Sequence, residues 1–203
     1  MTRILALLIT ALLPTLALAQ EAPEALVKRV TDELLTIIKN DKAVQSGDMT
    51  KVAQLAEQKV LPHFDFERMT RLAVGKNWRD ASDAQKKALQ DEFRTLLVRT
   101  YSSSLAAYRN QTIEVKPGNT GAADKEAVVK TAVIQQGGPS IPINYSMEKT
   151  DSGWKVYDVV IDGASLVTTY RGSFNDQIQK GGIDGLVKSL QERNRSAPEP
   201  AKK

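Results

Sequence analysis

The chain has 203 residues, of which 41% are hydrophobic and 26% are charged, and its 28 basic and 24 acidic residues give a net charge of +4. With no cysteine and a single histidine, it can form no disulfide and lacks the ligands that zinc prefers. The charges are interspersed rather than gathered in basic runs, which argues against a nucleic-acid-binding protein.

The first nineteen residues have the pattern of a cleavable signal peptide. A basic residue near the start is followed by an almost unbroken apolar run over residues 4–13, and the small residues Ala17 and Ala19 precede a cleavage point at Gln20. The alternative is an N-terminal membrane anchor, but this run is shorter than the roughly 20 residues of a spanning helix. The sequence therefore predicts export.

Removal of this signal peptide would leave 184 residues, which is enough for one domain with a sizeable core. We expect this domain over residues 20–194 and a disordered tail over residues 195–203. Since there is no cysteine to accept a lipid, we expect a protein released into an oxidising compartment without an anchor of its own.

Apolar residues at helical spacing dominate the first half of the chain. They predict helices over residues 24–42, 50–61 and 67–74. Ser82 and Gln85 have the spacing of a capping box, which opens the longest helix. The residues expected on the inward face of this helix are Leu89, Phe93, Leu96, Leu97, Thr100, Tyr101, Ser104, Leu105 and Tyr108.

After Asn110 the apolar period changes to two, which indicates strands. Four strands are expected, over residues 112–116, 126–135, 140–149 and 154–161. Their short connections imply antiparallel neighbours, and two further helices are expected over residues 166–179 and 183–194. The predicted fold class is therefore α+β, with helices covering one face of a four-stranded antiparallel sheet.

Reactive groups are few. His63 stands beside Pro62 in an aromatic segment without a nucleophile motif, so a packing or capping role is favoured over catalysis. The chain has no acidic loop of the kind that binds calcium, and the residues around Lys76 lack the rest of a phosphate-binding loop. We expect no metal, no cofactor and no ATPase activity.

An enzyme of cone-shaped fold is nevertheless an alternative, because an acid near tyrosines in an apolar pocket can act on an apolar small molecule as an isomerase or hydrolase. Asp158 and Tyr145 are the candidates. Strict alternation directs Asp158 away from both Tyr157 and Val159, which puts its carboxylate on the outer face of the sheet. A third possibility is an adaptor whose core is filled, because composition does not distinguish a solid core from a hollow one.

Two stretches resemble signatures of a known family. They are LPHFDFERMTRLAVGKNWR over residues 61–79, and VIDGASLVTTYRGSF over residues 160–174 followed by GGIDGL over residues 181–186. Both are similar to the MlaC family, also described as the toluene-tolerance family, which comprises periplasmic phospholipid-binding proteins of the pathway that maintains lipid asymmetry. The resemblance extends over the whole exported chain except its tail. It implies a curved sheet related to the nuclear-transport-factor-2 fold, with helices enclosing a deep apolar pocket.

The resemblance also implies which residues bind lipid. The expected lining residues are Phe66, Met69, Leu72, Trp78, Phe93, Leu97, Tyr101, Leu105, Val133, Ile143, Tyr145, Met147, Val159, Ile161, Leu166, Tyr170 and Phe174. The small side chains of Ser102, Ser103 and Ser104 would leave room beside the long helix. Arg71, Arg109 and Arg171 are the candidates for pairing with a lipid phosphate at the mouth of the pocket.

The partners and function that the resemblance implies are those of a monomeric carrier. Its ligand would be a phospholipid, and its partners would be an inner-membrane ABC transporter complex with an MCE-type lipid-binding subunit and an outer-membrane lipoprotein–porin complex. The carrier would move phospholipids between the outer and inner membranes and so maintain the asymmetry of the outer membrane.

Overall fold

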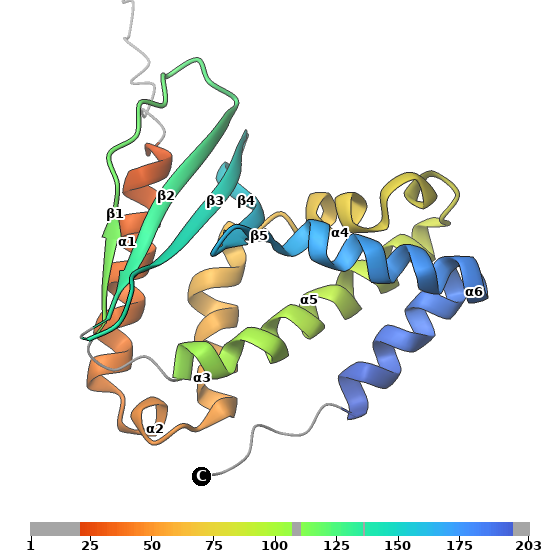
Figure 1. Cartoon of the computed structure of the whole chain (residues 1–203), viewed down its shortest axis with the longest axis horizontal. Coiled ribbons are helices and arrows are strands. Elements are labelled where there is room, and N and C mark those ends of the chain that lie inside the picture. The colour runs from red at the N-terminus through yellow and green to blue at the C-terminus, as the bar shows by residue number, and fades with distance from the viewer. Residues whose placement is uncertain (1–20, 107–110, 136, 197–203) are drawn as a thin grey trace, which may run out of the picture.

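The computed structural model describes residues 21–106, 111–135 and 137–196 (Figure 1). The helices are α1 (Pro23–Asn40), α2 (Lys42–Gln45), α3 (Met49–Leu55), α4 (Phe66–Val74), α5 (Asp83–Ala106) and α6 (Leu166–Ser196). A π-helical turn, η1 (Ala56–Val60), and a 3-10 turn, η2 (Leu61–His63), follow α3, and a second 3-10 turn, η3 (Gly75–Arg79), follows α4. The predicted signal peptide, Arg109, and residues 197–203 of the predicted tail lie outside the described residues.

The strands form one antiparallel sheet in which each strand lies beside its neighbours in sequence. They are β1 (Thr112–Val115), β2 (Glu126–Ile134), β3 (Ile141–Thr150), β4 (Gly153–Ile161) and β5 (Ala164–Ser165). The predicted α+β class and the antiparallel sheet are confirmed. The sequence did not predict β5, because a strand of two residues is too short to show alternation.

The helix predictions hold with three differences. A short helix, α2, precedes the break at residues 46–48, and the predicted helix over residues 50–61 is divided into α3, η1 and η2. The last two predicted helices are joined into α6, which is interrupted at Gly182, where φ is 67°. The capping box is confirmed, because the backbone N–H of Gln85 donates to Ser82 Oγ (3.2 Å) and that of Ser82 donates to Gln85 Oε1 (2.9 Å).

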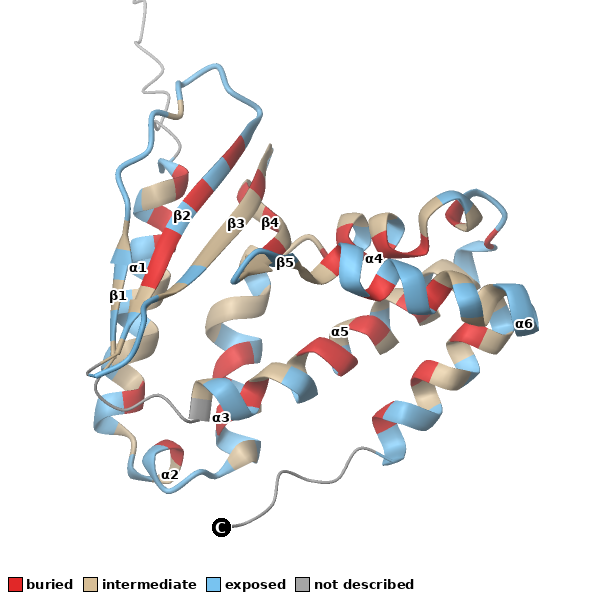
Figure 2. Cartoon of the chain, in the orientation of Figure 1, coloured by how far each residue is buried: buried red, intermediate tan, exposed pale blue. Residues whose placement is uncertain are grey.

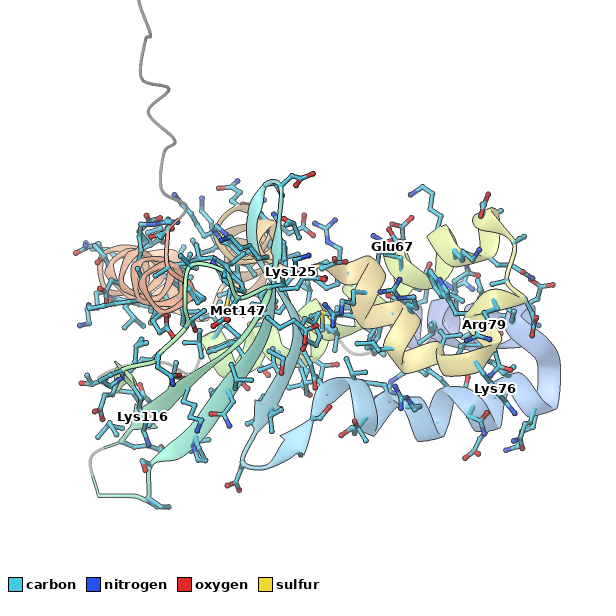
Figure 3. All side chains as sticks on the ribbon, turned by 90° about the horizontal axis from the view of Figure 1, so that it is seen from above. Glu67, Lys76, Arg79, Lys116, Lys125 and Met147 are labelled. Atoms are coloured by element: carbon cyan, nitrogen blue, oxygen red, sulfur yellow. The ribbon has the colours of Figure 1, made fainter. Side chains whose placement is uncertain are left out.

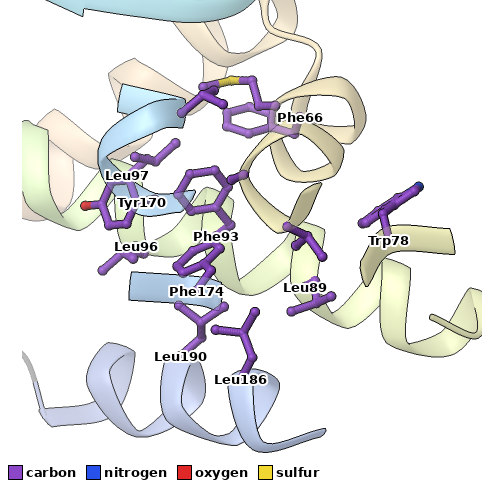
Figure 4. Packing of buried hydrophobic residues seen from close by; sticks show 14 residues of the cluster. Phe66, Trp78, Leu89, Phe93, Leu96, Leu97, Tyr170, Phe174, Leu186 and Leu190 are labelled. Carbon is purple, nitrogen blue, oxygen red and sulfur yellow. The ribbon is translucent and has the colours of Figure 1, made fainter. Parts of the chain in front are cut away.

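A helical core fills one end of the molecule, where α4, η3, α5 and α6 pack together (Figures 1 and 4). The ring of Phe93, which is fully buried, meets the rings of Tyr170 and Phe174 edge-on, with centroid distances of 5.1 and 5.2 Å. Such pairs are favoured by the aromatic quadrupole in addition to the burial of apolar surface. Leu186 and Leu190 of the second half of α6 complete this core.

A second core lies between the sheet and α1. Leu26 and Val27 of α1 pack with Val129, Met147 and Trp154 of the sheet. The opposite face of the sheet is more open, and Val128 of β2 is 54% exposed there (Figure 2). These two cores lie toward opposite ends of the molecule, and α5 extends from the helical core toward the sheet. A third, smaller core of Ile38, Val44, Val52 and Leu55 joins α1, α2 and α3.

A β-bulge interrupts the pairing of β3 with β4, where the register shifts between Ser146 and Met147. The extra residue turns Tyr157 away from the sheet core and toward the helical core, whereas Val159 remains in the sheet core. The prediction that Tyr157 and Val159 share a face is therefore wrong, because a bulge breaks the strict alternation on which it rested.

The bulge also brings Tyr157 to the residue that ties α4 to the sheet. The guanidinium of Arg68 lies 3.6 Å from the centre of the Tyr157 ring, and it forms ion pairs with Glu126 of β2 and Glu148 of β3. Burial acts to lower the pKa of Arg68, but these two carboxylates more than compensate and keep it raised. One side chain of α4 thus contacts three strands.

Replacement of Phe93 by alanine is expected to lower the free energy of unfolding by about 3–5 kcal/mol, because it leaves a void among the rings of α6. Urea denaturation would measure this loss. Val128→Ala, on the exposed face of β2, should change the free energy by less than about 0.5 kcal/mol. Equal effects of the two substitutions would contradict the description of the helical core.

Candidate functional site

An apolar cavity of about 290 Å³ lies between the sheet and the C-terminal half of α5. Tyr145 of β3 and Val159 of β4 line it from the sheet, and Leu97 and Tyr101 line it from α5. None of its eighteen lining residues is charged. Ser104, which also lines the cavity, is exposed, so the cavity reaches solvent beside the end of α5.

The cavity is hollow in part because two of the side chains that α5 presents to it are small. Phe93 and Leu96 fill the helical core, but one to two turns further on the cavity is lined by Ser102 and Ser104. Across the cavity, Ala56 of η1 is also small. These small side chains leave space between α5 and the sheet that the larger lining residues do not fill.

The structure brings ten of the seventeen predicted lining residues to this cavity. They are Phe66, Met69, Leu97, Tyr101, Leu105, Ile143, Tyr145, Val159, Ile161 and Leu166. They come from α4, α5, β3, β4 and the start of α6, which are far apart in the sequence but meet at the junction of the two cores.

The other seven predicted residues do not line the cavity. Leu72, Trp78, Phe93, Tyr170 and Phe174 pack in the helical core. Met147 is fully buried in the sheet core (Figure 3), and Val133 is half-buried on β2. Apolar spacing identified these positions as inward-facing, but it did not indicate which of the two interiors each of them faces.

Six further lining residues were not among those predicted. They are Leu34, Ala56, Val60, Leu61, Phe64 and Val98. Leu34 belongs to the apolar stripe of α1, and Phe64 lies in the aromatic segment before α4, where it forms a bridge with Val156 of β4. Their apolar character was visible in the sequence, whereas their position at one cavity depends on the approach of α1 and η1 to α5.

The polar groups in the cavity are neutral hydroxyls. Burial raises the pKa of Tyr145, and a hydrogen bond with Thr131 opposes this shift only in part. Burial also raises the pKa of Tyr101, and Tyr170 adds to the effect. Both phenols therefore stay protonated at neutral pH, so the cavity offers hydroxyl groups but neither a charge nor a general base.

Asp158, the acid of the enzyme alternative, does not line the cavity. Its Oδ2 accepts a hydrogen bond from Ser165 Oγ (2.6 Å), and its Oδ1 accepts one from the backbone N–H of Val167 (3.1 Å). The carboxylate therefore caps the first turn of α6, where a negative charge is stabilised by the unpaired N–H groups.

The arginines predicted to pair with a lipid phosphate are not found at the cavity. Arg71 and Arg171 are exposed on α4 and α6, and neither lines it. The Nε of Arg171 donates to the backbone carbonyl of Leu72 (2.9 Å), which fastens α6 to α4. Arg109 lies outside the described residues.

The described part of the chain offers neither a metal site nor a membrane-spanning helix. It contains no group of three or more His, Asp or Glu side chains that could hold a metal ion. None of its helices combines the length and the apolar character that crossing a membrane requires.

The chain belongs to the MlaC protein family, whose model matches residues 28–192. It is 27% identical to the toluene tolerance protein ttg2D of Pseudomonas putida, over 88% of this chain and 83% of that protein. It is 25% identical to the intermembrane phospholipid transport system binding protein MlaC of Haemophilus influenzae, over 97% and 92% of the two chains.

A solved structure of a relative contains a ligand. It is the phospholipid-binding protein from Ralstonia solanacearum in complex with a phospholipid, and it is 42% identical to this chain. The two structures superpose with a TM-score of 0.81, over 86% of this chain and 98% of that one.

His63 gives a pH test of the packing around η2. Burial lowers the pKa of His63, and the nearby charges of Arg29 and Lys155 lower it further. The neutral form is thus favoured in the folded protein. The contribution of neutral His63 to the free energy of unfolding is complete above the pKa of about 6.5 that histidine has in the unfolded chain. This contribution is lost as the pH falls through the lower pKa of the folded protein.

Urea denaturation at about pH 7.5 and about pH 5.5 should therefore show a loss of stability on acidification that is smaller in His63→Gln than in the unmodified protein. An identical loss in both proteins would mean that His63 is not held neutral by its surroundings.

Proposed function

We propose that the protein is a carrier that holds the acyl chains of a phospholipid in the cavity between the sheet and α5. The observation that carries the proposal is the cavity itself, whose eighteen lining residues include no charged side chain. The phospholipid bound by the Ralstonia relative, at 42% identity, supports the same assignment.

The physics of lipid transfer explains why such a cavity is needed. Keeping one methylene group from water is worth about 0.8 kcal/mol, so two chains of about sixteen carbons represent on the order of 20 kcal/mol. A phospholipid therefore does not cross water rapidly without a carrier. A cavity of about 290 Å³ lies at the lower end of the roughly 300–1,000 Å³ typical of small-ligand sites. We expect it to widen when two chains enter.

The proposed setting is the periplasm, with transfer of phospholipids between the outer and inner membranes. The proposed partners are an inner-membrane ABC transporter complex with an MCE-type subunit and an outer-membrane lipoprotein–porin complex. The predicted export signal over residues 1–19 and the names of the relatives, one of which is a binding protein of an intermembrane phospholipid transport system, support this setting.

A carrier needs no reaction, and we propose that the protein is not an enzyme. The isomerase or hydrolase alternative requires an acid or base at the cavity. Asp158 is engaged in capping α6, and the phenols of Tyr101 and Tyr145 are held neutral. No observation favours the alternative.

Native mass spectrometry of the purified protein is expected to show one or two co-purifying phospholipids, which extraction with organic solvent would release and identify. A protein that is free of lipid and takes up none from phospholipid vesicles would contradict the proposal.

A pair of substitutions on β4 tests the location. Val159→Phe adds a ring inside the cavity and should reduce the retained phospholipid several-fold, because the new side chain occupies the space of an acyl chain. Val160→Phe, one residue further along the strand, adds the same ring on the opposite side and should retain lipid normally. Lipid content would be measured in the solvent extract. Equal retention by the two folded variants would place the acyl chains elsewhere.

A further inference from the structure

The side chains with a hydroxyl group that line the apolar cavity are Tyr101, Ser102, Ser104 and Tyr145. Two of them are engaged within the protein. Ser102 Oγ donates to a backbone carbonyl one turn earlier in α5 (2.6 Å), and the hydroxyl of Tyr145 is hydrogen-bonded to Thr131. The hydroxyls of Tyr101 and Ser104 have no hydrogen-bond partner among the described residues. They are therefore the donors that remain available to a ligand.

These two hydroxyls lie toward the open end of the cavity. Tyr101 and Ser104 are three residues apart on α5, so their side chains are neighbours on one face of the helix. Exposure increases along this face, because Leu97 is 7% exposed, Tyr101 is half-buried and Ser104 is exposed. The pair therefore lies where the apolar cavity meets solvent.

The available hydroxyls are suited to donate to a neutral acceptor. Burial raises the pKa of Tyr101, so its phenol keeps its proton at neutral pH. The cavity lining outside the four hydroxyl-bearing residues is entirely apolar and offers no other side-chain donor. An acceptor that reaches the open end of the cavity thus meets Tyr101 and Ser104 or no side-chain donor at all.

A diacyl lipid brings such acceptors to this place. Its two ester groups lie where the acyl chains join the polar part of the molecule. When the chains occupy the cavity and the polar part stays in water, the esters lie at the boundary between the two. An ester carbonyl that leaves water without meeting a donor loses free energy, and a hydroxyl at the boundary prevents this loss.

From these observations we infer that Tyr101 and Ser104 donate hydrogen bonds to the ester carbonyls of the bound lipid and make the carrier selective for diacyl over dialkyl ether lipids. This inference rests on the proposed function. An ether lipid with the same chains and the same headgroup has no carbonyl at this position, so it leaves both hydroxyls without that acceptor. The selection acts on the linkage of the chains, and Tyr101, the more buried of the two residues, contributes most of it.

A competition between two lipids tests the inference. Lipid-stripped protein is incubated with equal amounts of dipalmitoyl phosphatidylglycerol and its dihexadecyl ether counterpart, and native mass spectrometry measures the ratio of the two complexes. The unmodified protein should favour the diacyl lipid by about tenfold. Tyr101→Phe keeps the ring and removes the hydroxyl, and should lower this preference about fivefold, the effect of one neutral hydrogen bond. Tyr101→Phe/Ser104→Ala should remove what remains.

The matched control is Tyr157→Phe. It removes the hydroxyl of a tyrosine that stacks on Arg68 and does not line the cavity, so the preference for the diacyl lipid should persist. Uptake of the ether lipid on its own should be the same in all variants, which shows that each is folded and has an intact cavity.

Two kinds of result would overturn the inference while the proposed function stands. One is equal binding of the two lipids by the unmodified protein. The other is a preference that Tyr101→Phe leaves unchanged, or that Tyr157→Phe lowers by the same factor. If the unmodified protein takes up neither lipid, the proposed function itself fails, and the inference fails with it.

Discussion

Helix α5 is packed on several sides in its N-terminal half and on fewer in its C-terminal half, and the cavity follows from this difference. Phe93 fixes the first half of the helix between α4 and α6. The helix then continues rigidly toward the sheet, where it presents Tyr101 and small serine side chains. Because a helix held firmly at one end does not collapse onto a neighbouring surface at the other, the space between α5 and the sheet remains.

Two residues at the bulge of β4 hold α4 and α6 against the sheet. Tyr157 stacks under the guanidinium of Arg68, which joins α4 to β2 and β3 by ion pairs. Asp158 caps the first turn of α6 and so sets the direction in which that helix leaves the sheet. Both contacts lie outside the cavity, yet they hold α4 and the first turn of α6 against the sheet.

The sequence predicted the elements well, because each has a local signal. The alternation in β3 and the capping box of Ser82 depend on neighbouring residues alone. The site was predicted less completely. Phe93 and Tyr101 have the same helical spacing, but one is buried in the helical core and the other lines a cavity. Only the three-dimensional arrangement of α4, α6 and the sheet separates them. Likewise, no local sequence pattern predicts the bulge that turns Tyr157 from the sheet core toward the helical core.

The central claim is that acyl chains lie between the sheet and α5. Loading the protein with a phospholipid that carries a photoreactive diazirine in one acyl chain, followed by peptide mass spectrometry, would locate those chains directly. The account predicts crosslinks to cavity residues such as Tyr101, Tyr145 and Ile161. Crosslinks concentrated on Val128 of the exposed sheet face, or on the helical core around Phe174, would contradict it.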